Sequence, residues 1–63
     1  MKKYRGILKH QREKAPTRKT RWYDTKTAAR AFLILMYHRH RREYVGEKIE
    51  YIIDSEGKVY NNV

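Results

Sequence analysis

The segment from Lys26 to about Arg42 restricts the fold of this chain more than any other feature. It follows two helix-capping candidates, Asp24 and Thr25, and is rich in residues that favour helix. Its apolar stripe consists of Ala29, Phe32, Leu33 and Met36. Because these residues recur at intervals of three and four, we predict one amphipathic helix whose stripe packs on a sheet. Gly46 lies just beyond and can end the helix.

Short β-forming segments lie on both sides of this helix. Residues 3–9 and 18–23 precede it, joined by a polar and basic connection that contains Pro16. Residues 48–54 and 58–60 follow it, separated by a turn sequence that ends at Gly57. The order ββαββ predicts an α+β fold, a small antiparallel sheet with one long helix packed on one face.

Alternation along the strands assigns their side chains to faces. In residues 3–9, Tyr4 and Leu8 share one face, and the other carries Arg5, Ile7 and Lys9. In residues 18–23, Thr20 and Trp22 share one face, and the other carries Lys19, Arg21 and Tyr23. In residues 48–54, Ile49, Tyr51 and Ile53 alternate with Lys48, Glu50 and Ile52. If the two basic faces coincide, Tyr4, Leu8, Thr20 and Trp22 lie beneath the helix and a row of cations with Tyr23 faces outward.

The chain has 63 residues and no cysteine. A chain of this length buries only about 60% of the surface that its unfolded form exposes, so its core is small. The lack of cysteine excludes a disulfide framework and a thiolate zinc site. We expect residues 1–63 to form a single small basic domain, with frayed termini at 1–2 and 61–63.

Charge is distributed unevenly along the chain. Residues 1–42 carry fourteen basic and two acidic side chains, a net +12, whereas residues 43–63 carry two basic and five acidic ones, a net −3. A net charge of about 2–8 is enough for a small domain to remain in solution. The basic excess therefore indicates a surface that binds a polyanion.

Two groups of cations make up this predicted surface. One is the outer row of the sheet with its flanking loop, and the other is the basic end of the helix. The candidate nucleic-acid-binding residues are Arg5, Lys9, Arg12, Lys14, Arg18, Lys19, Arg21, Tyr23, Lys26, Arg39, Arg41 and Arg42. Cations that neutralise phosphates beside an aromatic ring are typical of a sheet that binds nucleic acid.

The helix also carries apolar residues outside its main stripe. Ala31 and Ile34 point away from the sheet, and His38 follows on the same side. A helix that is apolar on most sides is either buried on two sides or binds a partner. Ala31, Ile34 and His38 therefore form a possible surface for a homodimer or an acidic protein partner.

Residues 4–33 resemble the ββα core of AP2-type and integrase arm-type DNA-binding domains. The resemblance consists of Tyr4-Arg5-Gly6-Ile7, then Arg21-Trp22-Tyr23-Asp24-Thr25, then Thr27-Ala28-Ala29-Arg30-Ala31-Phe32. In those families the sheet enters the major groove, which implies a reading role for Arg5, Lys9, Lys19, Arg21 and Tyr23. The chain departs from the pattern because it has two strands before the helix instead of three, Thr27 in place of an acid, and an extra C-terminal hairpin.

Catalytic chemistry has little support in the sequence. Ser55 lies in an acidic turn, and His38 and His40 are two residues apart, so on a helix they cannot share a metal ion. No glycine-rich phosphate loop is present. We therefore predict no enzyme activity, no catalytic residues, no metal and no cofactor.

No segment of the sequence is apolar for the roughly 20 residues that a membrane-spanning helix requires. We expect a cytoplasmic protein with no membrane partner. The leading hypothesis is a small regulatory protein that binds nucleic acid through its basic sheet face. We expect the ligand to be DNA rather than RNA. The small size suits a protein encoded by a phage or a mobile element.

Two alternatives remain open. In the first, the chain is a protein-interaction module that inhibits or modulates an acidic host protein. In the second, it is an RNA-cleaving toxin that uses His10, His38 or His40 as a general acid or base.

Overall fold

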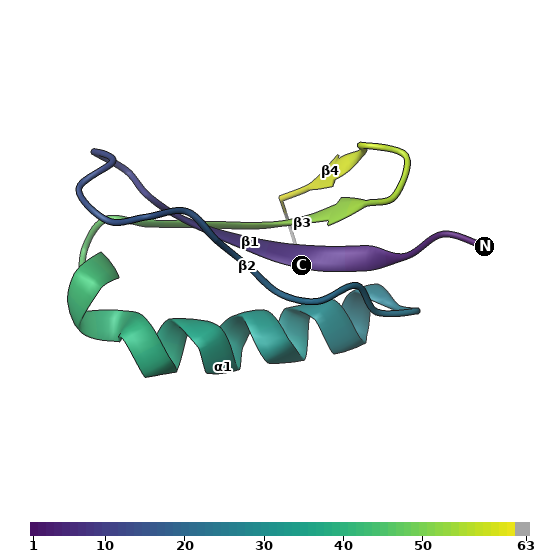
Figure 1. Cartoon of the computed structure of the whole chain (residues 1–63), viewed down its shortest axis with the longest axis horizontal. Helices are drawn as coiled ribbons and strands as arrows, with labels where there is room; N and C mark the ends of the chain where they lie inside the picture. The colour runs from purple at the N-terminus through teal and green to yellow at the C-terminus, as the bar shows by residue number, and fades with distance from the viewer. Residues whose placement is uncertain (62–63) are drawn as a thin grey trace.

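The computed structural model describes residues 1–61 of the chain. Its elements are β1 (Tyr4–His10), β2 (Arg18–Lys19), α1 (Lys26–Tyr44), β3 (Lys48–Asp54) and β4 (Val59–Tyr60). The strands form one antiparallel sheet in the order β2-β1-β3-β4, and α1 runs along one face of it (Figure 1). This confirms the predicted α+β fold with the order ββαββ. Residues 62–63, part of the terminus expected to fray, lie outside the described residues.

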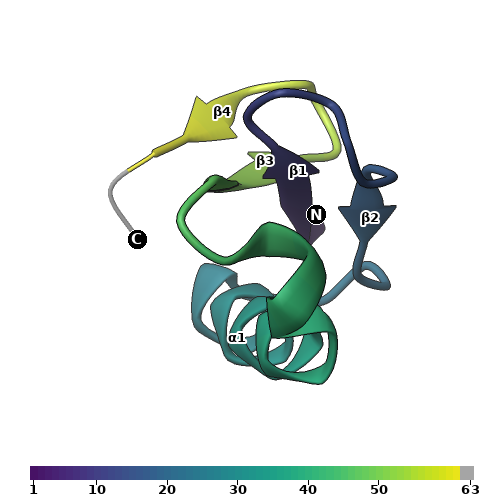
Figure 2. The same cartoon turned by 90° about the vertical axis from the view of Figure 1, so that its left-hand side faces the viewer.

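β1 and β3 form the centre of the sheet. They pair in continuous register from Tyr4↔Asp54 to His10↔Lys48. Leu8 and Ile52 pack against the helix, so the even-numbered side chains of both strands face α1 and the odd-numbered ones face away. Seen end-on, α1 lies under this central pair, with β2 at one edge and β4 at the other (Figure 2).

The core lies between the central strands and α1. Its fully buried members are Leu8, Ala29, Leu33, Tyr44 and Ile52. At Gly6 the strand and the helix come so close that an added Cβ would lie 2.6 Å from the Cβ of Leu33. Glycine at this position therefore sets the distance between the sheet and α1.

α1 begins and ends close to the predicted positions. Thr25 is the N-cap, and its side-chain oxygen accepts a hydrogen bond from the Ala28 amide at 3.1 Å. The helix continues beyond the predicted Arg42 to Tyr44, with non-helical backbone angles at His40. Tyr44 is buried, and its hydroxyl donates to the Pro16 carbonyl, so the last turn of α1 holds the β1–β2 connection in place.

The predicted stripe of α1 is correct except for one residue. Ala29 and Leu33 are buried and Met36 is half-buried, whereas Phe32 is 45% exposed. Phe32 instead stacks on Tyr23, with ring centroids 4.6 Å apart and planes within 3°. Phe32 therefore covers the edge of the core rather than its centre.

The segment after β2 departs from the predicted strand 18–23. β2 contains only Arg18–Lys19, and pairing with β1 resumes at a single bridge, Tyr4↔Tyr23. Between these points residues 20–22 lie opposite residues 5–6, so the segment contains one extra residue, as in a β-bulge. An extra residue inverts the alternation that follows it.

This inversion exchanges two aromatic side chains. Tyr23 lies on the helix side, and Trp22, which was expected beneath the helix, is 42% exposed beside Arg5. Thr20 stabilises the irregular segment, because its amide donates to the Gly6 carbonyl at 2.9 Å and its hydroxyl accepts from the Gly6 amide at 2.8 Å. The predicted faces of Trp22 and Tyr23 are therefore wrong.

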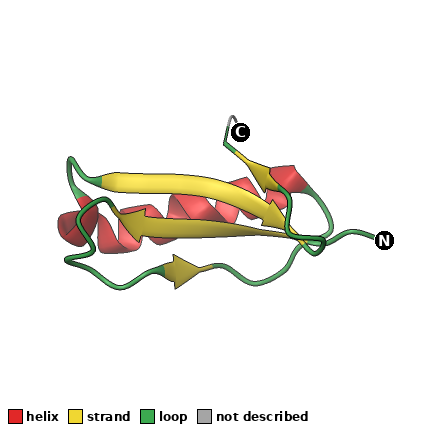
Figure 3. Cartoon of the chain, turned by 90° about the horizontal axis from the view of Figure 1, so that it is seen from above, coloured by secondary structure: helices red, strands yellow, loops and turns green. Residues whose placement is uncertain are grey.

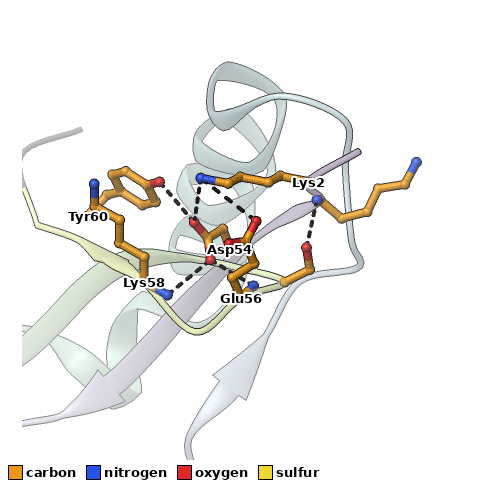
Figure 4. Close-up of polar contacts among 7 residues, drawn as sticks. Lys2, Asp54, Glu56, Lys58 and Tyr60 are labelled. Carbon is orange, nitrogen blue, oxygen red and sulfur yellow. Dashed lines mark hydrogen bonds and ion pairs between the residues drawn. The ribbon is translucent and has the colours of Figure 1, made fainter.

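The C-terminal hairpin is organised by a buried carboxylate. Asp54 accepts hydrogen bonds from the amides of Glu56 (2.8 Å) and Lys58 (3.0 Å) and from the hydroxyl of Tyr60 (2.9 Å), with the Lys2 ammonium 3.8 Å away (Figure 4). Burial by itself would raise the pKa of Asp54, but these hydrogen bonds and Lys2 bring the pKa below its ordinary value. The bond to Asp54, with burial, raises the pKa of Tyr60 to about 12.

Candidate nucleic-acid interface

The face of the sheet opposite α1 is not covered by any element of residues 1–61 (Figure 3). We call it the uncovered face. It contains a shallow hollow of about 250 Å³ that crosses β2, β1 and β3. The residues that line the hollow are Arg5, Ile7, Lys9, Thr17, Lys19, Trp22, Tyr51 and Ile53. Three of the predicted binding residues, Arg5, Lys9 and Lys19, therefore lie together.

The cations of the uncovered face have no acidic neighbours there. Among the described strands, the outward positions carry Arg5, Ile7, Lys9, Lys19, Ile49, Tyr51, Ile53 and Val59, and none is a carboxylate. Within residues 1–61, Arg5, Lys9 and Lys19 take part in none of the ion pairs. This face therefore has a positive potential that internal pairing does not cancel.

Arg5 and Trp22 form an ordered unit at one end of the hollow. The guanidinium carbon of Arg5 lies 4.4 Å from the centroid of the Trp22 ring. The Nε–H of the same guanidinium donates to the Thr20 carbonyl at 3.1 Å. A cation held on an aromatic ring in this way leaves its outer N–H groups free for an anionic ligand.

Two predicted binding residues are paired with acids of the last third of the chain. Arg12 Nε lies 2.7 Å from Glu47 Oε1, and Arg18 Nη2 lies 3.3 Å from Glu43 Oε1. The acid-rich segment thus folds back on the basic one and neutralises part of it. Arg12 and Arg18 contribute less to an anion site than their charges suggest.

Three further predicted residues border a different depression. Arg21, Tyr23 and Arg39 line a groove of about 530 Å³ between the β2 segment and α1. We call this the β2–α1 groove, and its lining consists of Thr17, Arg18, Lys19, Thr20, Arg21, Tyr23, Phe32, Leu35, Met36, Arg39 and His40. Arg21 and Tyr23 therefore do not join the hollow on the uncovered face, because the extra residue in 20–22 redirects them.

The remaining predicted cations are dispersed. Lys14 is exposed in the β1–β2 connection, and the Lys26 ammonium lies 4.6 Å from the centroid of the Tyr60 ring. Arg41 and Arg42 are exposed in the last turn of α1. Neither Arg41 nor Arg42 lines the hollow on the uncovered face.

The predicted partner surface consists of residues on α1. Ala31, Ile34 and His38 are exposed on α1, with Ile34 39% exposed. None of the three lines the β2–α1 groove. Their role in a dimer or a complex stays a prediction.

The three histidines lie at two places in the described chain, with His10 in β1 and both His38 and His40 bordering a depression at the end of α1. His10 is buried, its Nδ1 accepts the Arg12 amide proton at 3.0 Å, and its Nε2 lies 2.9 Å from Glu47. His40 contacts Glu43 on the same helix. Among residues 1–61, no three histidine, aspartate or glutamate side chains are grouped as metal ligands.

No helix in the described part of the chain is both long and apolar enough to cross a bilayer.

Sequence reasoning missed two aromatic residues of the uncovered face, Trp22 and Tyr51. The position of Tyr51 follows from its pairing with Ile7, because partners in an antiparallel pair share a face. No sequence pattern indicated the position of Trp22, because regular alternation placed its side chain beneath the helix.

Comparisons with protein-family models, with curated proteins and with solved structures give no match to this chain. The resemblance to AP2-type and integrase arm-type domains therefore stays a prediction, and the site is argued from its own geometry.

Proposed function

We propose that this protein is a non-enzymatic nucleic-acid-binding protein that contacts DNA with the uncovered face of its sheet. The observation that carries the proposal is the grouping of Arg5, Lys9 and Lys19 with Trp22 and Tyr51 on a face without a carboxylate. A cationic sheet face with an exposed and a half-buried aromatic ring supplies both phosphate neutralisation and planar contacts to sugars and bases.

The mechanism divides the work between two kinds of residue. Lys9 and Lys19 release counterions from the phosphates, which supplies affinity without sequence preference. Arg5, held on Trp22, presents a fixed guanidinium that can read a guanine edge in the major groove. The short, open sheet acts as a rigid platform, and the regulatory effect comes from occupying the DNA.

The first test is fluorescence anisotropy with a labelled duplex at increasing salt. The two phosphate contacts of Lys9 and Lys19 predict that log K falls with log [salt] with a slope of about −2. The double variant Lys9→Ala/Lys19→Ala should reduce the slope by about two and leave folding intact, since both side chains point to solvent.

The matched control removes the same charge elsewhere. Arg30→Ala/Lys58→Ala takes two exposed cations from α1 and from the hairpin turn, away from the uncovered face. We expect this variant to retain most of the affinity and the slope. Equal weakening by both double variants would show that only net charge matters and would contradict the proposed site. If an RNA duplex or a single strand binds more tightly than the DNA duplex, DNA is not the ligand.

A further inference from the structure

Apart from Lys19, which borders both depressions, the charged and aromatic side chains of the β2–α1 groove are not used by the proposed DNA contact. The groove is lined by residues of the β2 segment and of α1. Within residues 1–61, β2 is an edge strand of the sheet (Figure 2). The volume of the groove is about 530 Å³, roughly twice that of the hollow on the uncovered face.

The floor of the groove is apolar. It consists of the stacked pair Tyr23 and Phe32, followed along α1 by Leu35 and Met36. Phe32 is 45% and Leu35 59% exposed. Exposed apolar side chains that continue a packed core toward solvent are typical of a docking surface.

The rim of the groove is cationic. Arg21 and Arg39 are exposed, and within residues 1–61 neither takes part in an ion pair. Arg18 shares Glu43 with His40, yet its Nε is buried without a hydrogen-bond partner in the described structure. An occupant with carboxylates complements this cationic rim.

The backbone of β2 offers a third kind of contact. The Thr20 amide donates to Gly6 of β1. Because backbone groups alternate in direction along a strand, the amide and carbonyl of Lys19 point to the free edge. An extended peptide can pair with such an edge and place its alternate side chains in the adjoining groove.

We propose that the β2–α1 groove binds an extended, acidic segment of a partner protein. The segment adds a strand beside β2 at Lys19, lays an apolar side chain on Phe32 and Leu35, and pairs its carboxylates with Arg21 and Arg39. The part of this chain that the structure describes does not supply such a segment to a second copy. Its acidic turn contains Asp54, which is buried and already bound by Lys58, Glu56 and Tyr60.

The probe is an acetylated and amidated heptapeptide with a Val-Phe-Val centre and two glutamates on each side. We expect saturable binding at physiological salt, with amide chemical-shift changes confined to residues 17–23 and 32–40. Replacing the glutamates with lysine removes the charge complementarity with the cationic rim. Replacing the first valine with proline removes a backbone amide that would pair with β2. Both changes should abolish saturation, and binding of either altered peptide with equal affinity would contradict the proposal.

Paired variants of the protein locate the site. Leu35→Ser should weaken the peptide about tenfold, whereas Ile34→Ser, its exposed neighbour outside the groove, should not. Arg39→Ala should weaken the peptide several-fold and Arg30→Ala should not. Circular dichroism checks that each variant is folded.

Two outcomes would overturn the proposal. In the first, Ile34→Ser and Leu35→Ser have equal effects, which would place the peptide on the outer helix surface. In the second, a DNA duplex shifts the groove amides and displaces the peptide, which would assign the groove to nucleic acid. Weaker DNA binding in Lys9→Ala, a residue of the hollow that does not line the groove, together with unchanged peptide binding keeps the two sites distinct.

Discussion

The two faces of the sheet differ in how they use the same strands. On the face under α1, Gly6, Leu8 and Ile52 are buried, and the carboxylate of Asp54 has a full set of hydrogen-bond donors. On the uncovered face, Ile49 is 41% and Trp22 42% exposed, and the cations beside them have no acidic partner among residues 1–61.

β3 shows what this difference means. Its more apolar side, with Ile49, Tyr51 and Ile53, faces outward, and its more polar side faces the helix. A rule that buries the most apolar face of each strand would place this strand the other way round. Partly exposed apolar and aromatic groups beside unpaired cations support the proposal that this face contacts DNA.

The largest effect on stability is expected from Gly6→Ala. The new Cβ would overlap the Cβ of Leu33, so α1 must move away from the sheet, at a cost of about 1–3 kcal/mol in the free energy of unfolding. Urea denaturation followed by circular dichroism measures the change.

Gly46→Ala is the control for Gly6→Ala. No atom lies within 4 Å of a Cβ added at Gly46, but its φ of 75° is strained for alanine. It should cost about 1 kcal/mol. Equal costs at the two glycines would contradict the view that close packing under the covered face dominates.

An intermediate effect is expected from Asp54→Asn. The substitution removes the charge that Tyr60, Lys2 and two backbone amides stabilise, so the melting temperature should fall, though less than with Gly6→Ala. Glu56→Gln, an exposed neighbour that also contacts Lys2, should have little effect. Identical melting curves for the two variants would show that the buried carboxylate does not organise the hairpin.

The same group makes stability depend on pH. Because the pKa of Asp54 is lower in the folded state than its ordinary 3.8, its contribution is present above pH 4 and is lost as pH falls through the folded pKa. Because the pKa of Tyr60 is raised from 10.0 to about 12, its contribution is present below pH 10 and is lost between pH 10 and 12.

Thermal melts across pH measure both dependences. The alkaline loss should disappear in Tyr60→Phe, and the Asp54 contribution to the acid loss should disappear in Asp54→Asn. An alkaline transition that persists unchanged in Tyr60→Phe would contradict the assignment.

The smallest effect on stability is expected from Trp22→Ala on the uncovered face. The side chain is 42% exposed and lies outside the core cluster, so the free energy of unfolding should change by less than about 1 kcal/mol. Duplex affinity should nevertheless fall about tenfold, because Arg5 loses its support and the DNA loses a planar contact.

Ile49→Ala is the matched control for Trp22→Ala. Its side chain is equally exposed on the same face but does not line the hollow. Its affinity for DNA should be unchanged. If Trp22→Ala unfolds the protein, the uncovered face stabilises the fold as the covered face does. That result would contradict the difference between the two faces.

Much of the fold could be predicted from local patterns. The cap at Thr25, the end of α1 near Gly46 and the span of β3 follow from residue preferences and periodicity that need no distant partner. The grouping of Arg5, Lys9 and Lys19 was also predictable, because regular alternation holds along β1 and through Lys19.

The sequence by itself determined the order of elements, the residues that face the helix along β1, and the excess of positive charge. Only the tertiary structure decided which cations stay unpaired, because Glu43 and Glu47 reach Arg18 and Arg12 through the fold and not through nearness in the chain. It also decided the faces of Trp22 and Tyr23, because one extra residue opposite Arg5 and Gly6 inverts the alternation, and that insertion exists only where two strands pair.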